Sequence, residues 1–130
     1  MYKIAQLILV LHIASRANRC SLTKLHLFNW AFKAPERGQR LSQAARSKSL
    51  NVPAWGFDPA LAIALRYATA EGLVIAARSG YELSDMGKIF AKSIMEKPGV
   101  LESEKELLKE IGKNISESMV DEVAKGWDAK

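Results

Sequence analysis

The chain has 130 residues, of which 48% are hydrophobic, and a formal net charge of +5 with a pI of about 9.4. This length and apolar content predict one folded domain with a substantial core, and they exclude a disordered chain. The single cysteine, Cys20, cannot form an internal disulfide and fits a reducing, cytoplasmic compartment.

The charge is unevenly distributed along the sequence. Residues 1–57 contain nine lysines and arginines and one acid, Glu36, whereas residues 99–130 contain five lysines and eight acids. A basic front and an acidic tail predict that a polyanion or an acidic protein surface lies near the first segment.

The first predicted element is a buried helix over Ile4–Ala14, an apolar run behind Lys3. The run is too short to span a bilayer, which takes roughly 20 residues. Arg16 and Arg19 stand where a signal peptide has small cleavage-site residues, so we expect neither a membrane segment nor a secretion signal.

Two more helices and a loop follow. Ser21 is suited to cap a helix that runs to about Lys33, and Pro35 suits the start of a helix over Glu36–Lys48. Pro53 and Gly56 predict a loop over Ser49–Phe57, in which we also consider a short strand.

The segment Asp58–Gly87 carries the strongest pattern in the sequence. Asp58-Pro59 predicts a helix start and Gly72 a helix end. A hairpin is then predicted, with strands at Val74–Arg78 and Tyr81–Leu83, before Ser84-Asp85 begins another helix. Helix, strand, turn, strand and helix is the order of elements in the second half of a winged helix.

The helix before this hairpin is apolar almost all round, with Arg66, Tyr67 and Thr69 as its only polar side chains between Pro59 and Ala70. Reading base edges in a major groove requires several arginine, lysine, asparagine or glutamine side chains on one face. We therefore expect the helix Ala60–Ala70 to be buried, in the core or under a partner, and not to read DNA.

The composition changes after Pro98-Gly99. Leu101–Ile111 is rich in glutamate and lysine, and Asn114 or Ser116 is suited to cap a last amphipathic helix. The predicted fold is α+β and mostly α: a winged-helix core over residues 1–98 with one two-stranded hairpin, and a C-terminal helical extension over residues 99–130.

Catalytic patterns are absent from the sequence. His12, His26 and Cys20 lack the spacing of metal ligands, and no glycine-rich phosphate loop or nucleophile motif is present. We expect no catalytic residue, no metal and no cofactor, and we interpret both histidines as structural, with His26 on the polar side of its helix.

Two sets of residues are candidates for binding. The first set is a basic cluster made of Arg37, Arg40, Arg46 and Lys48. These side chains either contact the phosphates of a nucleic acid or form a solvated segment that maintains solubility. The second set is a predicted partner interface of apolar residues, chiefly from the last helix: Trp30, Val120, Val123 and Trp127. The alternative that Trp127 packs against the core of its own chain remains open.

Several segments together resemble one family, the small middle components of bacterial ABC-three-component (Lamassu-type) defence systems. They are LHLFNWAFK at Leu25–Lys33, PALAIALRYATAEGLV at Pro59–Val74, YELSDMGK at Tyr81–Lys88 and the tail Glu102–Val123. The resemblance implies a non-catalytic winged-helix adaptor that works beside an SMC/Rad50-like coiled-coil ATPase and a nuclease-like effector in anti-phage or anti-plasmid defence. It carries over no short functional motif.

Two alternatives remain open at this point. A winged-helix transcriptional regulator would bind a palindromic duplex as a symmetric dimer, and a dimeric accessory subunit would serve a condensin-like complex. An adaptor would contact DNA weakly and without sequence preference.

Overall fold

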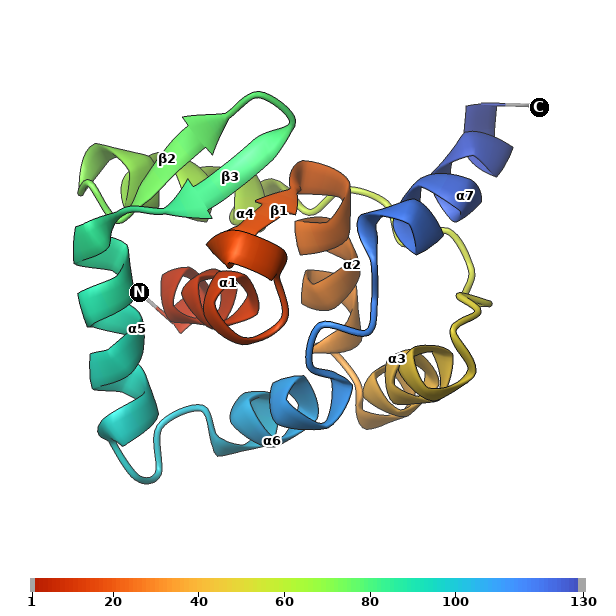
Figure 1. The fold of residues 1–130 in the computed structure, drawn as a ribbon, viewed down its shortest axis with the longest axis horizontal. Coiled ribbons are helices and arrows are strands. Elements are labelled where there is room, and N and C mark those ends of the chain that lie inside the picture. Colours follow the sequence, from red (N-terminus) through yellow and green to blue (C-terminus); the bar gives the residue numbers. More distant parts are fainter. Residues whose placement is uncertain (1, 129–130) are drawn as a thin grey trace.

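A computed structural model describes residues 2–128, and the side chains of residues 2–126. Seven α-helices and three short strands follow one another in this part of the chain (Figure 1). The elements are α1 (Tyr2–Ile13), a 3₁₀ turn (Arg16–Asn18), β1 (Arg19–Ser21), α2 (Leu22–Ala31), α3 (Pro35–Ser47), α4 (Pro59–Ala70), β2 (Val74–Ala77), β3 (Gly80–Leu83), α5 (Asp85–Glu96), α6 (Glu102–Ile111) and α7 (Glu117–Asp128).

Helix α1 is the centre of the molecule, and other elements surround it (Figure 1). It contacts α2, α4, α5 and α6, as well as β3. Six consecutive residues, from Gln6 to Leu11, are buried, so the helix has no continuous solvent face over this stretch. The expectation of a buried first helix is confirmed. A helix that is apolar all round requires cover on every side, which explains the arrangement of the other helices.

The sheet has three antiparallel strands in the order β1-β3-β2. The predicted hairpin is present, with Val74 paired with Leu83 and Ala77 paired with Gly80. The prediction of only two strands was wrong, because Cys20 also pairs with Tyr81 on the other side of β3. At Gly80 a Cβ atom would lie 2.0 Å from the Cys20 carbonyl oxygen, so this close pairing requires glycine.

Capping residues determine where several helices begin. Ser21 accepts a hydrogen bond from the Lys24 amide, and Ser84 accepts one from the Gly87 amide. Asp58 caps α4 through the Ala60 amide, and the Ser116 hydroxyl accepts from the Met119 amide at the start of α7. These caps satisfy amides that have no partner within the helix, as the sequence pattern predicted.

Helix α4 differs from its prediction. One face is buried, through Leu61, Ala64, Leu65 and Ala68, and packs on α1. The opposite face is open to solvent, and Tyr67 on it is 62% exposed. The chain itself covers only one side of Ala60–Ala70, so the helix is not fully buried in its own core, and its burial under a partner stays a prediction.

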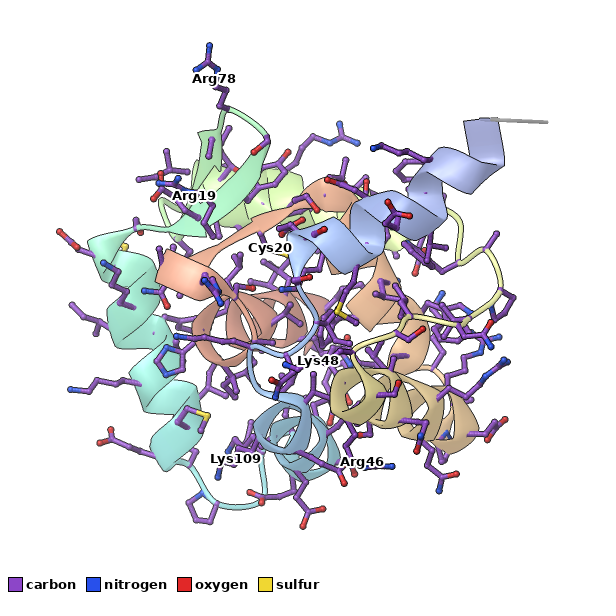
Figure 2. All side chains as sticks on the ribbon, turned by 45° about the vertical axis from the view of Figure 1, so that its right-hand side comes forward. Arg19, Cys20, Arg46, Lys48, Arg78 and Lys109 are labelled. Atoms are coloured by element: carbon purple, nitrogen blue, oxygen red, sulfur yellow. The ribbon has the colours of Figure 1, made fainter. Side chains whose placement is uncertain are left out.

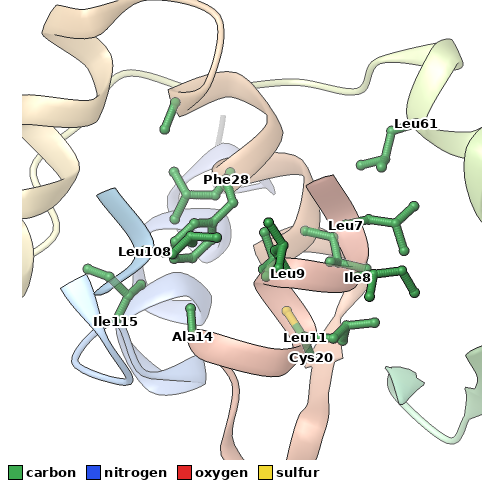
Figure 3. Packing of buried hydrophobic residues seen from close by; sticks show 14 of the residues in the cluster. Leu7, Ile8, Leu9, Leu11, Ala14, Cys20, Phe28, Leu61, Leu108 and Ile115 are labelled. Carbon is green, nitrogen blue, oxygen red and sulfur yellow. The ribbon is translucent and has the colours of Figure 1, made fainter. Parts of the chain in front are cut away.

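The last two helices belong to the same hydrophobic cluster as α1 (Figure 3). Helix α6 packs on α1 and α3, and α7 packs on α2. Leu108, Ile111, Ile115 and Val120 are all 0% exposed. The prediction that apolar residues of the last helix face a partner is therefore corrected at Val120. The division at residue 98 coincides with the break between α5 and α6 and otherwise stays a prediction.

No helix among the described residues is long and apolar enough to cross a membrane.

We predict that Leu108→Ala lowers the free energy of unfolding by about 2–5 kcal/mol, because it leaves a cavity in the shared core. The matched control is Ile89→Ala on α5, where the side chain is 70% exposed and the change should stay within about 0.5 kcal/mol. Urea denaturation followed by circular dichroism measures both. A loss below about 1 kcal/mol for Leu108→Ala would mean that α6 is not an integral part of the core.

Candidate functional site

The four basic residues of the predicted nucleic-acid cluster do not form one patch. Arg37 and Arg46 are nine residues apart on α3, which is two and a half helical turns, so they lie on opposite sides of the helix. Arg40, three residues after Arg37, shares its side. Lys48 follows the helix end with a positive φ of 60°.

Arg46 and Lys48 lie on the side of α3 that meets the C-terminal helices (Figure 2). Arg46 forms an ion pair with Glu110 at 3.8 Å, and the Lys48 ammonium donates to the Asn114 side chain at 2.5 Å. Both pairs are exposed, so each contributes little to stability. They nevertheless direct these two cations toward residues 110–114 and away from Arg37 and Arg40.

Arg37 and Arg40 lie beside α2 and the loop that precedes α4. The Arg37 guanidinium carbon is 5.0 Å from the centre of the Trp30 ring, and one of its N–H groups donates to the Trp30 carbonyl oxygen at 3.3 Å. Arg40 donates to the Asn51 carbonyl oxygen at 3.5 Å. The stacking on Trp30 holds the Arg37 charge in a fixed place on a half-buried aromatic ring.

Residues 54–57 of the loop line a cleft of about 300 Å³ together with Trp30 and Arg37. Trp55 anchors the loop, since its side chain is buried and its ring N–H donates to the Thr23 carbonyl oxygen at 3.0 Å. Phe57, two residues later, is 76% exposed. The prediction of a loop is confirmed, and it contains no strand.

Asp58 is the acidic centre of this region. Its Oδ2 atom is 2.9 Å from the Lys33 ammonium and 3.7 Å from that of Lys3, and it accepts from the Asn29 amide at 3.0 Å. The hydrogen bonds from Lys33, Asn29 and the Ala60 amide hold the pKa of Asp58 well below its usual value. The carboxylate is therefore ionised at neutral pH, with two lysines around one negative charge.

His26 is buried beside this carboxylate, which corrects its expected place on the polar side of α2. It is 3% exposed, its Nδ1 atom accepts a hydrogen bond from the Asp58 amide at 3.2 Å, and its ring meets Phe57 edge to face at 4.5 Å. Burial lowers its pKa, and the charge of Lys33 lowers it further against the opposite effect of Asp58. His26 is thus a neutral structural acceptor that fixes the end of the loop.

The residues predicted to contact a partner are in different environments. Val120 is buried in the chain's own core, which corrects the expectation that it faces a partner, and Val123 is half-buried against the same core. The Trp127 side chain lies outside the described residues. Trp30 lines the cleft with Arg37.

The exposed face of α4 is an apolar surface that sequence reasoning did not identify as open. Ile63, Tyr67 and Ala70 line a groove of about 440 Å³ together with Arg66, the one charged residue there. Ile63 is 46% exposed and Ile75, on the neighbouring strand β2, is 51% exposed. The signal was present in the sequence as a second apolar stripe, because Ile63, Tyr67 and Ala70 recur at the spacing of one helical face.

The described residues contain no group of three histidine, cysteine, aspartate or glutamate side chains that could hold a metal ion. Burial raises the pKa of the Cys20 thiol to about 12, so the sulfur is protonated and unreactive at neutral pH. The buried Glu104 accepts hydrogen bonds from the Tyr2 hydroxyl and the Gln6 amide.

Comparison of the chain with protein-family models, curated proteins and solved structures found no match in any of the three.

We predict that the free energy of unfolding falls as the pH decreases through about 6.5, the ordinary histidine pKa. His26 and His12 both have lowered pKa values in the fold, His12 through burial and the charge of Lys113, so the unfolded chain binds protons first. This stability is fully present above that pH, and each histidine contributes a slope of at most about 1.4 kcal/mol per pH unit.

Urea denaturation at several pH values between 5 and 8 measures the slope, and His26→Gln should reduce it. His12→Gln is the matched variant and should remove the part of the pH dependence that His12 contributes. Asp58 does not interfere, because a carboxylate with a lowered pKa loses its stabilising effect only at more acidic pH. An unchanged slope in His26→Gln would show that His26 is not held neutral.

Proposed function

We propose that the chain is a non-catalytic adaptor subunit with a winged-helix framework that docks on a protein partner through the exposed face of α4. The order α1-β1-α2-α4-β2-β3 and the strand order β1-β3-β2 support a winged-helix arrangement. The chain departs from the pattern between α2 and α4. A helix-turn-helix joins its two helices by 3–4 residues, whereas here α3 and the loop 49–57 are inserted.

The observation that carries this proposal is the chemistry of the α4 surface. In a winged helix this element enters the major groove and requires several donors and acceptors to read bases. Here the exposed face presents Ile63, Tyr67 and Ala70, with Arg66 as its one charge. An apolar face of this kind supports contact with a protein, since desolvated aromatic and aliphatic groups are the usual anchors of protein interfaces.

The partner follows from the family resemblance. In this proposal it is an SMC/Rad50-like coiled-coil ATPase that acts with a nuclease-like effector in cytoplasmic anti-phage or anti-plasmid defence. Nucleic acid is a second contact, bound without sequence preference. Within the predicted basic cluster, Arg37 and Arg40 are the better placed residues, because Arg46 and Lys48 are directed toward Glu110 and Asn114.

A winged-helix transcriptional regulator is the second candidate, and one observation favours it. Arg78 extends from the tip of the β2–β3 hairpin, where a wing would contact phosphate (Figure 2). A regulator would bind a palindromic duplex by itself as a symmetric dimer. An adaptor would show weak binding that does not depend on sequence.

We predict that Ile63→Asp together with Tyr67→Ala abolishes co-purification with a coiled-coil ATPase encoded beside this gene. The double variant places a charge in the groove and removes an exposed aromatic ring, and a buried aromatic anchor typically contributes about 2 kcal/mol or more to an interface. Circular dichroism should show an unchanged fold, because both side chains are on the open face of α4.

The matched control is Ile89→Asp on α5, which is also exposed and should leave co-purification unchanged. Val120→Asp should instead unfold the chain, because it buries a charge in the core. Continued co-purification of a folded Ile63→Asp, Tyr67→Ala variant would rule out α4 as the docking face. The absence of such an ATPase gene nearby would count against the adaptor role itself.

A further inference from the structure

The cleft between α2, α3 and the loop 49–57 brings together a fixed guanidinium, an exposed aromatic ring and a surplus of positive charge. On one wall, Arg37 is stacked 5.0 Å above Trp30 and tied to the Trp30 carbonyl oxygen. That bond occupies one of the five N–H groups of the guanidinium, which leaves donors available for an anion. The Arg37 charge is therefore preorganised before any ligand arrives.

The other wall holds Phe57 in an exposed position. Trp55 is anchored to the Thr23 carbonyl oxygen, and the Asp58 amide donates to His26, so the loop is fixed on both sides of Gly56 and Phe57. The edge of one ring meets the face of the other between His26 and Phe57, with an interplanar angle of 79°. Phe57 is thus 76% exposed while its ring is in contact with His26, so much of its surface remains accessible to solvent.

The charge around the cleft favours an anion. Asp58 already has Lys33 at 2.9 Å and Lys3 at 3.7 Å, so its negative charge is compensated within the protein. Arg37 lines the cleft and adds a positive charge to it. Arg40 lies outside the cleft lining, three residues along the same side of α3, and lines a neighbouring hollow together with Glu36, the acidic residue of that helix. The balance at the cleft is positive.

Single strands and duplexes differ in what they can offer to such a site. Both present phosphates to Arg37 and Arg40, but only an unpaired base exposes a π face that can stack on Phe57. A cleft of about 300 Å³ is small for a duplex and lies at the lower end of the size range of small-ligand pockets. Free phosphate would use the cations and leave the aromatic ring without a role.

We propose that this cleft binds single-stranded nucleic acid without sequence preference, with an unpaired base stacked on Phe57 and the adjacent backbone phosphates on Arg37 and Arg40. The inference rests on the nucleic-acid contact in the proposed function and specifies its ligand. The α4 groove shares no lining residue with this cleft, although Phe57 and Arg66 line a common hollow beside α4.

The test uses the whole chain and two labelled probes, an oligothymidylate of about 15 nucleotides and a duplex of the same length. Fluorescence anisotropy should show tighter binding of the single strand. Phe57→Leu keeps an apolar side chain without a π face, and it should weaken single-strand binding about 5- to 150-fold while leaving duplex binding unchanged. Phe57→Trp should restore the affinity, since it restores the aromatic face.

Salt dependence tests the phosphate contact separately. Arg37→Ala should reduce the slope of log affinity against log salt by about 0.7 for one lost phosphate on a single strand. The matched control is Arg46→Ala on the opposite side of the same helix, where Arg46 is paired with Glu110, and it should leave the affinity within about twofold.

The proposal would be overturned by equal binding of the duplex and the single strand, by an unaffected Phe57→Leu variant, or by an equal loss in Arg46→Ala and Arg37→Ala. Competition by inorganic phosphate alone at millimolar concentration, with no effect of Phe57→Leu, would identify a simple anion site and also overturn it. Ile63→Asp with Tyr67→Ala should bind the single strand normally. Failure of the adaptor role and failure of this inference are thereby distinguishable.

Discussion

The fold depends on the burial of α1 on all sides between Gln6 and Leu11. Leu7, Ile8 and Leu11 are almost fully removed from water, and burial of each such side chain contributes about 1.5–3 kcal/mol. Because a single helix cannot cover a cylinder that is apolar on all sides, α2, α4, α5, α6 and the sheet all pack around it. The covering elements are therefore placed by one central helix, and their outer faces become the available surface of the protein.

Covering α1 uses one face of α4 and leaves the other free. Helix α4 has two apolar stripes: Leu61 and Leu65 on one side pack inward, while Ile63 and Tyr67 on the other have no cover within the described chain. The apolar residues of the C-terminal helices are instead buried, since Leu108 and Val120 pack in the core. The proposed docking surface is accordingly on α4 rather than on the last helix.

The insertion between α2 and α4 has a comparable effect on charge. It places Arg37 against the Trp30 ring, and Trp55 anchors its loop. The loop ends at Asp58, which contacts His26, Lys33 and Asn29. Arg37 and Arg46 both belong to helix α3 of this insertion but lie on opposite sides of it. The basic residues of the sequence are therefore divided between a polar cleft that Arg37 lines and two exposed pairs, the ion pair Arg46–Glu110 and the hydrogen bond Lys48–Asn114.

Local patterns in the sequence predicted the helices and the hairpin to within a few residues. Caps such as Ser21, Asp58 and Ser84 act within three residues of the helix starts that they mark. The sequence could not indicate β1, whose three residues carry no periodic pattern and gain their partner from a strand about 60 residues away. Which apolar stripe of α4 faces water depends on tertiary packing, since both stripes have the same helical spacing and burial depends on what packs against them. Tertiary packing also creates the cleft, because Trp30, Arg37 and Phe57 come from three segments whose proximity no local pattern encodes.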